Sequence, residues 1–206
     1  MKKLALAAAL ALSATVVNAA PITAVVSSTN NGYRGSLTLL NDGIFPAQGS
    51  AANGATTVSW NGNGADKGFK FAFDGRYLLE DIRLSVDAND QYRLDYSLDD
   101  VNWLPLFTVF ASYGEITSGM DTMSTVLGDP DYVAQIDFSP VAASFVRITA
   151  DDGVKPYAIG EVAFSGTRVV QPPSSAAAIP EPGVLALLAT ALGAGVLIRR
   201  RGIQKS

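Results

Sequence analysis

The sequence predicts an all-β fold, a sandwich of two packed sheets, for the central part of its 206 residues. Two observations support this prediction. Short runs of apolar side chains alternate with polar ones, which is typical of half-buried antiparallel strands whose successive side chains face opposite ways. No stretch of the centre repeats apolar residues at the spacing of an amphipathic helix. Such sheets bury their apolar faces by packing on each other.

The alternating runs are separated by clusters of glycine, asparagine and aspartate. They lie at residues 69–73, 82–86, 92–96, 146–148 and 162–164. A tight polar turn at 87–90, between two of these runs, predicts a β-hairpin. Asp87, Asn89 and Asp90 alternate somewhat like a calcium loop, but no glycine and glutamate follow at the spacing of an EF-hand. A turn is therefore the favoured interpretation.

The first 19 residues have the three parts of a secretory signal peptide. Lys2 and Lys3 precede an apolar run from Leu4 to Val17, and small residues follow as far as Ala19. We expect cleavage after Ala19, so that the mature chain is exported. The alternative is an N-terminal membrane anchor that stays in place.

The last 27 residues, 180–206, have a fixed order of three elements. The motif Pro180, Glu181, Pro182 is followed by an apolar stretch at 183–198 and by the cluster Arg199, Arg200, Arg201. This order resembles the PEP-CTERM sorting signal of exported proteins in Gram-negative bacteria that make exopolysaccharide. The resemblance implies that an intramembrane processing enzyme, an exosortase, recognises the motif and removes the tail.

The apolar stretch at 183–198 predicts a transmembrane helix. Its length of about 24 Å is short of the roughly 30 Å hydrocarbon core, as suits a transient anchor. The arginines that follow it stop transfer and keep that end cytoplasmic. We expect a precursor held in the inner membrane and a product at the cell surface or in the extracellular matrix. A permanent single-span anchor is the alternative. Residues 168–179, rich in proline, serine and alanine, form a linker to the domain at 20–167.

Composition excludes several chemistries. The chain has no cysteine and no histidine, so it has no disulfide, thiol nucleophile, Ser-His-Asp triad or histidine-ligated zinc. Residues 20–170 hold 18 acidic and 9 basic side chains, a net charge of −9. An acidic surface argues against binding nucleic acid and is compatible with divalent cations and neutral glycans.

Three segments of the domain carry a family resemblance. The segment at 96–103, Tyr-Ser-Leu-Asp-Asp-Val-Asn-Trp, is similar to a "Tyr-Ser-x-Asp-Gly-x-x-Trp" pattern of discoidin-like, galactose-binding-like domains. The segments at 143–148 and 158–166 resemble two later strands of that family, in the same order. Asp100 and Ser144 depart from the family, which has glycine and arginine there. The resemblance implies a jelly-roll β-sandwich over roughly residues 35–166.

The same resemblance implies a structural calcium site. In many such domains an early loop supplies a carboxylate and the closing strand supplies a glutamate, and these positions correspond to Asp42 and Glu161. Calcium takes six to eight oxygen ligands, so backbone carbonyls of the loop at 43–50 would have to join. The alternative is an ordinary Asp-Gly turn at Asp42 and an unrelated glutamate.

Aromatic residues on loops are candidates for binding sugars, because a ring can stack on the C–H face of a pyranose. Trp60, at the edge of a loop rich in glycine and asparagine, is the first candidate platform and Tyr113 is the second. Burial of Trp60 in the core is the alternative. Trp103 resembles a core residue of the family and is not assigned to a ligand.

The expected function is that of a non-enzymatic surface or matrix protein that binds exopolysaccharide or another envelope glycan. The alternative is a structural or adhesive protein that binds a protein partner and has no sugar site. A buried Trp60 together with a convex loop end would favour that alternative. Hydrolysis is disfavoured, because the sequential pairs Asp99–Asp100 and Asp151–Asp152 point to opposite faces when they lie on a strand.

Overall fold

The computed structural model describes residues 19–29, 32–64 and 66–170. The expected signal peptide lies almost entirely outside these residues, as do most of the linker and all of the expected sorting tail with its apolar stretch. In the part that is described, no helix has the length and hydrophobicity needed to cross a membrane.

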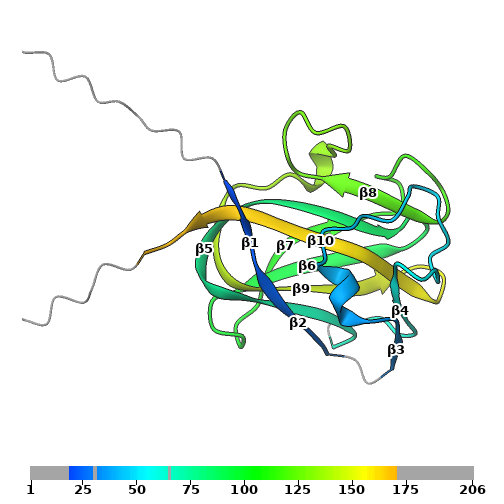
Figure 1. The fold of residues 1–206 in the computed structure, drawn as a ribbon, viewed down its shortest axis with the longest axis horizontal. Helices are drawn as coiled ribbons and strands as arrows, with labels where there is room; N and C mark the ends of the chain where they lie inside the picture. Colours follow the sequence, from blue (N-terminus) through cyan, green and yellow to red (C-terminus); the bar gives the residue numbers. More distant parts are fainter. Residues whose placement is uncertain (1–18, 30–31, 65, 171–206) are drawn as a thin grey trace, which may run out of the picture. The chain divides into compact units, whose positions relative to one another are not determined.

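The described residues form ten β-strands and two short 3-10 helices, and no α-helix (Figure 1). The strands are β1 (Ala20–Ile22), β2 (Ala24–Ser28), β3 (Tyr33–Arg34), β4 (Val58–Trp60), β5 (Gly68–Asp87), β6 (Gln91–Ser97), β7 (Leu104–Val109), β8 (Met120–Ser124), β9 (Val141–Asp152) and β10 (Tyr157–Arg168). The 3-10 helices are η1 (Leu37–Leu40) and η2 (Ala134–Ile136). The predicted all-β class is confirmed.

All strand pairs are antiparallel, and the long strand β5 belongs to both layers of the sandwich. Its first part, Gly68 to Phe73, pairs with β2 and β9, and β9 continues to β6 and β7. Its last part, Ile82 to Asp87, pairs with β10 and β8. Beyond β10 lie β4, β3 and β1.

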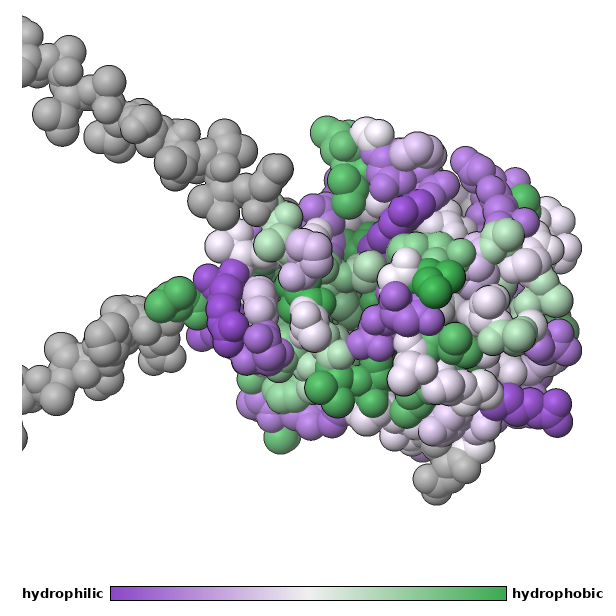
Figure 2. Space-filling model, in the orientation of Figure 1, coloured by the Kyte–Doolittle hydropathy of each residue, from purple (hydrophilic) through white to green (hydrophobic). Residues whose placement is uncertain are grey.

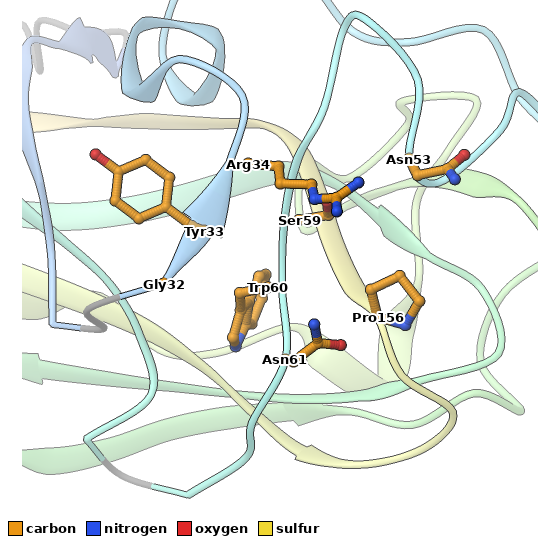
Figure 3. Close-up of a pocket in the computed structure, with 8 residues that line it drawn as sticks. All are labelled: Gly32, Tyr33, Arg34, Asn53, Ser59, Trp60, Asn61 and Pro156. Atoms are coloured by element: carbon orange, nitrogen blue, oxygen red, sulfur yellow. The ribbon is translucent and has the colours of Figure 1, made fainter.

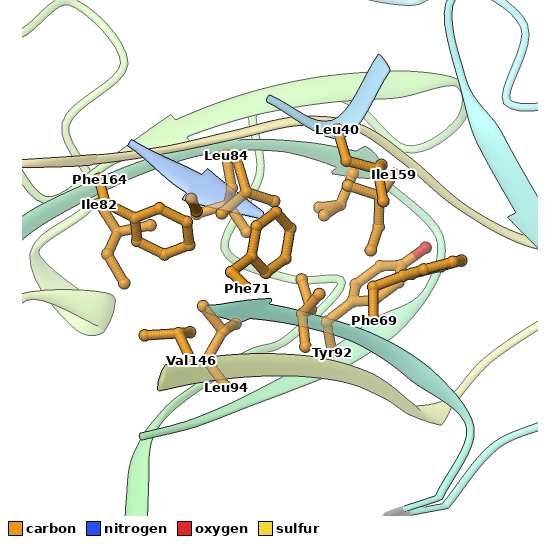
Figure 4. Close-up of a cluster of buried hydrophobic side chains, with 14 of the residues drawn as sticks. Leu40, Phe69, Phe71, Ile82, Leu84, Tyr92, Leu94, Val146, Ile159 and Phe164 are labelled. Atoms are coloured by element: carbon orange, nitrogen blue, oxygen red, sulfur yellow. The ribbon is translucent and has the colours of Figure 1, made fainter. Parts of the chain in front are cut away.

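The two layers bury their facing side chains in one core (Figure 4). Phe71 of the first layer meets Phe164 of the second, with ring centroids 5.1 Å apart. The core-facing members of the predicted alternating runs are fully or almost fully buried; they are Phe69, Phe71, Phe73, Ile82, Leu84, Val86, Tyr92, Leu94, Val146, Ile148, Val162 and Phe164. The two-sheet sandwich is therefore confirmed.

Two details differ from the sequence prediction. The runs at 69–73 and 82–86 are one strand, which passes from one layer to the other near Asp74 and Gly75. Arg168 donates to the carboxylate and the carbonyl of Asp74 at this corner. The turn at 87–90 does not close a hairpin, because β5 is already paired on both sides by β8 and β10. The turn carries the chain across to β6 in the other layer.

The two ends of β10 define the two ends of the sandwich. Near its C-terminal end, Gly166 pairs with Ala20, so both ends of the described chain lie together. At its other end, Tyr157 pairs with Trp60 of β4, and β4 in turn pairs with the short edge strand β3 (Figure 1). This second end, at the opposite end of β10 from the Ala20–Gly166 pair, carries the candidate site.

Candidate functional site

A pocket with a volume of about 560 Å³ lies beside the edge strands β3 and β4 and the start of β10 (Figure 3). Eight residues line it: Gly32, Tyr33, Arg34, Asn53, Ser59, Trp60, Asn61 and Pro156. Strand pairing fixes the wall, because Tyr33 is opposite Trp60 and Arg34 is opposite Ser59. Gly35, at a φ of 95°, allows β3 to approach β4, since a Cβ there would collide with the Thr57 carbonyl.

Trp60 is a core residue and not an open stacking platform, which corrects the first expectation for a sugar site. Its side chain is 2% exposed. The ring packs on Phe69, Tyr157 and Tyr92, with centroid distances of 5.1, 5.7 and 6.2 Å. These neighbours come from three different strands, so the sequence around Trp60 gives no sign of them.

One polar atom of the Trp60 indole is left without a partner in the described part of the chain. Its Nε1 is buried and has no hydrogen-bond partner among the described residues. An unsatisfied buried donor costs about 1 to 3 kcal/mol, and native structures rarely leave one without a reason. Because Trp60 also lines the pocket, this unused donor lies in the pocket wall, although the atom itself is not exposed.

Tyr33 is the exposed aromatic residue of the pocket, and sequence reasoning missed it. Its side chain is 40% exposed, and its ring meets Phe69 edge-on at 5.8 Å. Arg34 follows it on β3, and the two side chains leave the strand in different directions (Figure 3). The amides of Asn53 and Asn61 complete a polar rim, since both residues are exposed. The sequence signal was an aromatic and a cation between two glycines, Gly32 and Gly35.

Tyr113 lies in a different place from Trp60. It is half-buried and lines a separate depression of about 320 Å³, together with Gly114 and Glu115. Its ring contacts the Phe110 ring at 5.2 Å. The two predicted aromatic candidates therefore do not form one site. Trp103, which was not assigned to a ligand, is half-buried under the Arg147 guanidinium at 4.6 Å.

Asp42 and Glu161 lie side by side. Glu161, on β10, is 2% exposed, and its Oε2 accepts the Gly43 N–H at 3.2 Å. Burial, together with the negative charge of Asp42, raises the pKa of Glu161 to about 7. A cavity of about 220 Å³ reaches Gly43 and Glu161. Two adjacent carboxyl groups, one of them buried, supply oxygen ligands of the kind that a hard divalent cation binds.

These two carboxylates would not be sufficient by themselves for calcium. Across residues 19–29, 32–64 and 66–170, no three side chains of histidine, cysteine, aspartate or glutamate gather as a metal-binding group. A calcium ion beside Asp42 and Glu161 would therefore depend on backbone carbonyl oxygens, as the sequence analysis also required.

Asp90 braces the β10 side of the pocket, a role that sequence reasoning missed. Its side chain is 1% exposed, and its Oδ1 accepts the Val154 N–H at 2.8 Å. The Tyr92 hydroxyl, 3.2 Å from Asp90 Oδ2, also accepts the Ala158 N–H at 3.1 Å. Burial, with the charge of Asp87 acting the same way, raises the pKa of Asp90 to about 7. This network holds the turn that leads into Pro156.

Comparisons with known proteins give a distant likeness. No protein-family model and no curated protein matches the sequence. A family 89 glycoside hydrolase from Clostridium perfringens is 17% identical with a TM-score of 0.48; the match covers 72% of this chain and 15% of the hydrolase. A module called CpGH89CBM32-6, from the same organism, is 18% identical with a TM-score of 0.44 and coverages of 69% and 93%.

A pectin-binding carbohydrate-binding module is 17% identical with a TM-score of 0.42, and the match covers 79% of this chain and 96% of the module. This chain therefore spans most of the length of the two modules and a small part of the hydrolase. At these identities and TM-scores, the likeness assigns neither a family nor a ligand to this chain.

Proposed function

We propose that this chain is an exported, non-enzymatic surface or matrix protein whose sandwich binds a glycan in the pocket beside β3, β4 and β10. The observation that carries the proposal is the composition of the pocket. The pocket is lined by an exposed aromatic residue, Tyr33, by the indole of Trp60, whose buried N–H has no partner among the described residues, and by two amides, Asn53 and Asn61. A ring that covers sugar C–H groups, with polar groups that take the hydroxyls, is how a protein holds a pyranose.

The protein-partner alternative is less well supported. Trp60 is buried, as that alternative expects, but the loop end is hollowed by the pocket and is not convex. The face shown in Figure 2 has hydrophobic residues in small groups among hydrophilic ones. The described residues of that face therefore offer no single broad apolar area of the kind that obligate interfaces bury.

We propose a non-enzymatic role because the residues that line the pocket give no support for glycoside hydrolysis. Glycoside hydrolysis normally needs two carboxyl groups placed across one bond. None of the eight residues that line the pocket is aspartate or glutamate.

The route of export is proposed from the sequence. The signal peptide at 1–19 would export the chain, and the motif Pro180, Glu181, Pro182 with Arg199, Arg200 and Arg201 would direct processing by an exosortase. A protein delivered in this way meets exopolysaccharide, so the expected ligand and the expected location agree. Mass spectrometry of the protein from cells with and without the exosortase tests this, because only cells that contain the enzyme should yield a chain that ends near residue 180.

We also propose that the domain is a galactose-binding-like jelly roll with structural calcium held at Asp42 and Glu161. The proximity of these two carboxyl groups and the burial of Glu161 support it. The ion would offset the charge of the pair and stiffen the loop after Asp42.

Binding of residues 20–170 to the exopolysaccharide of the source organism tests the main proposal. This piece contains all ten described strands and the core. Loss of binding in Tyr33→Ala, with binding retained in Tyr113→Ala, is the expected result.

A further inference from the structure

Two thirds of the basic side chains of the domain pair with carboxylates, and the remaining three are informative. Residues 20–170 contain nine lysines and arginines. Six of them form ion pairs: Lys67, Lys70, Arg83, Arg93, Arg147 and Arg168. Among the described residues, no carboxylate pairs with Arg34, Arg76 or Lys155. Arg34 lines the pocket, and Lys155 directly precedes Pro156, which also lines it.

The pocket is therefore locally positive on a chain that is acidic as a whole. Arg34 is the one charged residue among the eight that line it. The domain around it carries a net charge of −9, which repels anions over most of the surface. Of the three cations without an ion pair among the described residues, Arg34 is the one that lines the pocket.

Arg34 is the exposed side chain of the pocket that only donates hydrogen bonds. The Arg34 guanidinium offers five N–H groups and accepts nothing, and the Trp60 Nε1–H is buried without an acceptor. The Asn53 and Asn61 amides and the Tyr33 and Ser59 hydroxyls both donate and accept. Neutral sugar hydroxyls donate as well as accept, whereas a carboxylate or a sulfate ester only accepts. The Arg34 guanidinium is therefore better matched by an acceptor-only group than by a hydroxyl.

We propose, as a refinement that rests on the glycan site proposed above, that the bound sugar carries an anionic substituent and that Arg34 binds it. The planar guanidinium forms paired hydrogen bonds with a carboxylate. Tyr33 and Arg34 point in different directions from β3 (Figure 3). The ring and the guanidinium therefore contact different parts of the ligand, which suits an oligosaccharide of acidic sugars.

Isothermal titration calorimetry on residues 20–170 tests this with three matched ligands. They are the trimer of galacturonic acid, its methyl ester, which keeps the ring and removes the charge, and a sulfated galactose trimer. The variant is Arg34→Gln, which removes the charge and keeps an amide. The control is Arg76→Gln, because Arg76 is also exposed and unpaired but does not line the pocket.

The expected result is that the wild-type domain binds one of the charged trimers at least tenfold more tightly than the methyl ester. Arg34→Gln should abolish this preference, and Arg76→Gln should keep it. Whether the uronate or the sulfate is preferred identifies the source of the anionic group.

Two outcomes overturn the inference and differ in what they say of the glycan site. Equal affinity for the charged and esterified trimers, lost in Tyr33→Ala, leaves the glycan site standing and refutes its charge preference. A preference for the charged trimer that survives Arg34→Gln also refutes it, since another group would be responsible. If the folded domain binds none of these ligands and no polysaccharide of the source organism, the glycan site and the inference both fail.

Discussion

The carboxylate of Asp90 accepts the backbone N–H of Val154 at 2.8 Å and so joins two turns at the end of the sandwich that carries the pocket. One turn links β5 to β6 and the other links β9 to β10. Because the second turn leads into Pro156 and Tyr157, the buried acid fixes the wall on which a ligand would rest. This contact connects the ionisation of one side chain to the shape of the site.

Stability should fall as pH rises from about 4 to above 7. The pKa of Asp90 is raised in the folded state to about 7, mainly by burial, from an ordinary value of 3.8. Below pH 4 the group is protonated in both states, so it contributes no difference. Between pH 4 and pH 7, Asp90 is ionised in the unfolded chain and still protonated in the folded one. This difference lowers the free energy of unfolding by at most about 4 kcal/mol. Glu161 acts in the same direction.

The variant Asp90→Asn tests the source of this dependence. The amide keeps an oxygen for the Val154 N–H and cannot ionise, so thermal denaturation should show a flatter pH profile than that of the wild type. A profile for Asp90→Asn that follows the wild-type curve from pH 4 to pH 8 would assign the dependence to other groups.

Gly153→Ala should destabilise the same turn strongly. Gly153 has a φ of 129°, and a Cβ there would collide with Asp90 Oδ1. The strain and the collision together should cost more than about 2 kcal/mol in the free energy of unfolding. Gly128→Ala is the matched control, because Gly128 has a φ of 90° but open space around its Cα. In urea denaturation, Gly128→Ala should lower the free energy of unfolding by only about 1 kcal/mol. Equal losses for the two variants would refute the close contact between Gly153 and Asp90.

Trp60→Phe separates the packing role of the indole from its N–H. The smaller ring should lower the free energy of unfolding by about 1 to 2 kcal/mol, because it leaves a partly filled space among Phe69, Tyr92 and Tyr157. Glycan affinity should fall severalfold, since the unpartnered N–H is lost. Trp103→Phe, remote from the pocket lining, should leave affinity unchanged. Unaltered affinity in folded Trp60→Phe would show that Nε1 makes no contact with the ligand.

Calcium should raise the melting temperature of the wild-type domain, and a chelator should reverse the change. Glu161→Gln should remove the response. The same substitution should also stabilise the metal-free domain above pH 7, because it replaces a buried carboxylate next to Asp42 with a neutral amide. Glu115→Gln, at an exposed acid, is the control. A melting temperature that is insensitive to calcium would leave Asp42 and Glu161 as a carboxyl pair without a metal.

The sequence predicted the layers of the fold better than their connections. Alternation is a local property of a strand, so the inward positions of β5, β6, β9 and β10 could be identified from residues alone. The union of 69–73 and 82–86 in one strand depends on partners more than fifty residues away, such as Phe145 and Phe164. The same is true of the turn at 87–90, which changes layers because both edges of β5 are occupied.

The site was harder to predict for the same reason. Trp60 is buried by aromatic rings from β5, β6 and β10, and two of them, Tyr92 and Tyr157, lie far from it in the sequence. Tyr33 and Arg34 become a pocket wall only because a two-residue strand pairs with β4. The proximity of Asp42 and Glu161 was expected from the family resemblance, and composition alone would not have paired them.

The most direct test of the glycan site is the affinity of residues 20–170 for the exopolysaccharide of the source organism, measured by calorimetry beside Tyr33→Ala and Tyr113→Ala. The account predicts saturable binding by the wild type and by Tyr113→Ala, and at least a tenfold loss in Tyr33→Ala. Absence of binding by the folded wild-type domain, or a loss confined to Tyr113→Ala, would contradict it.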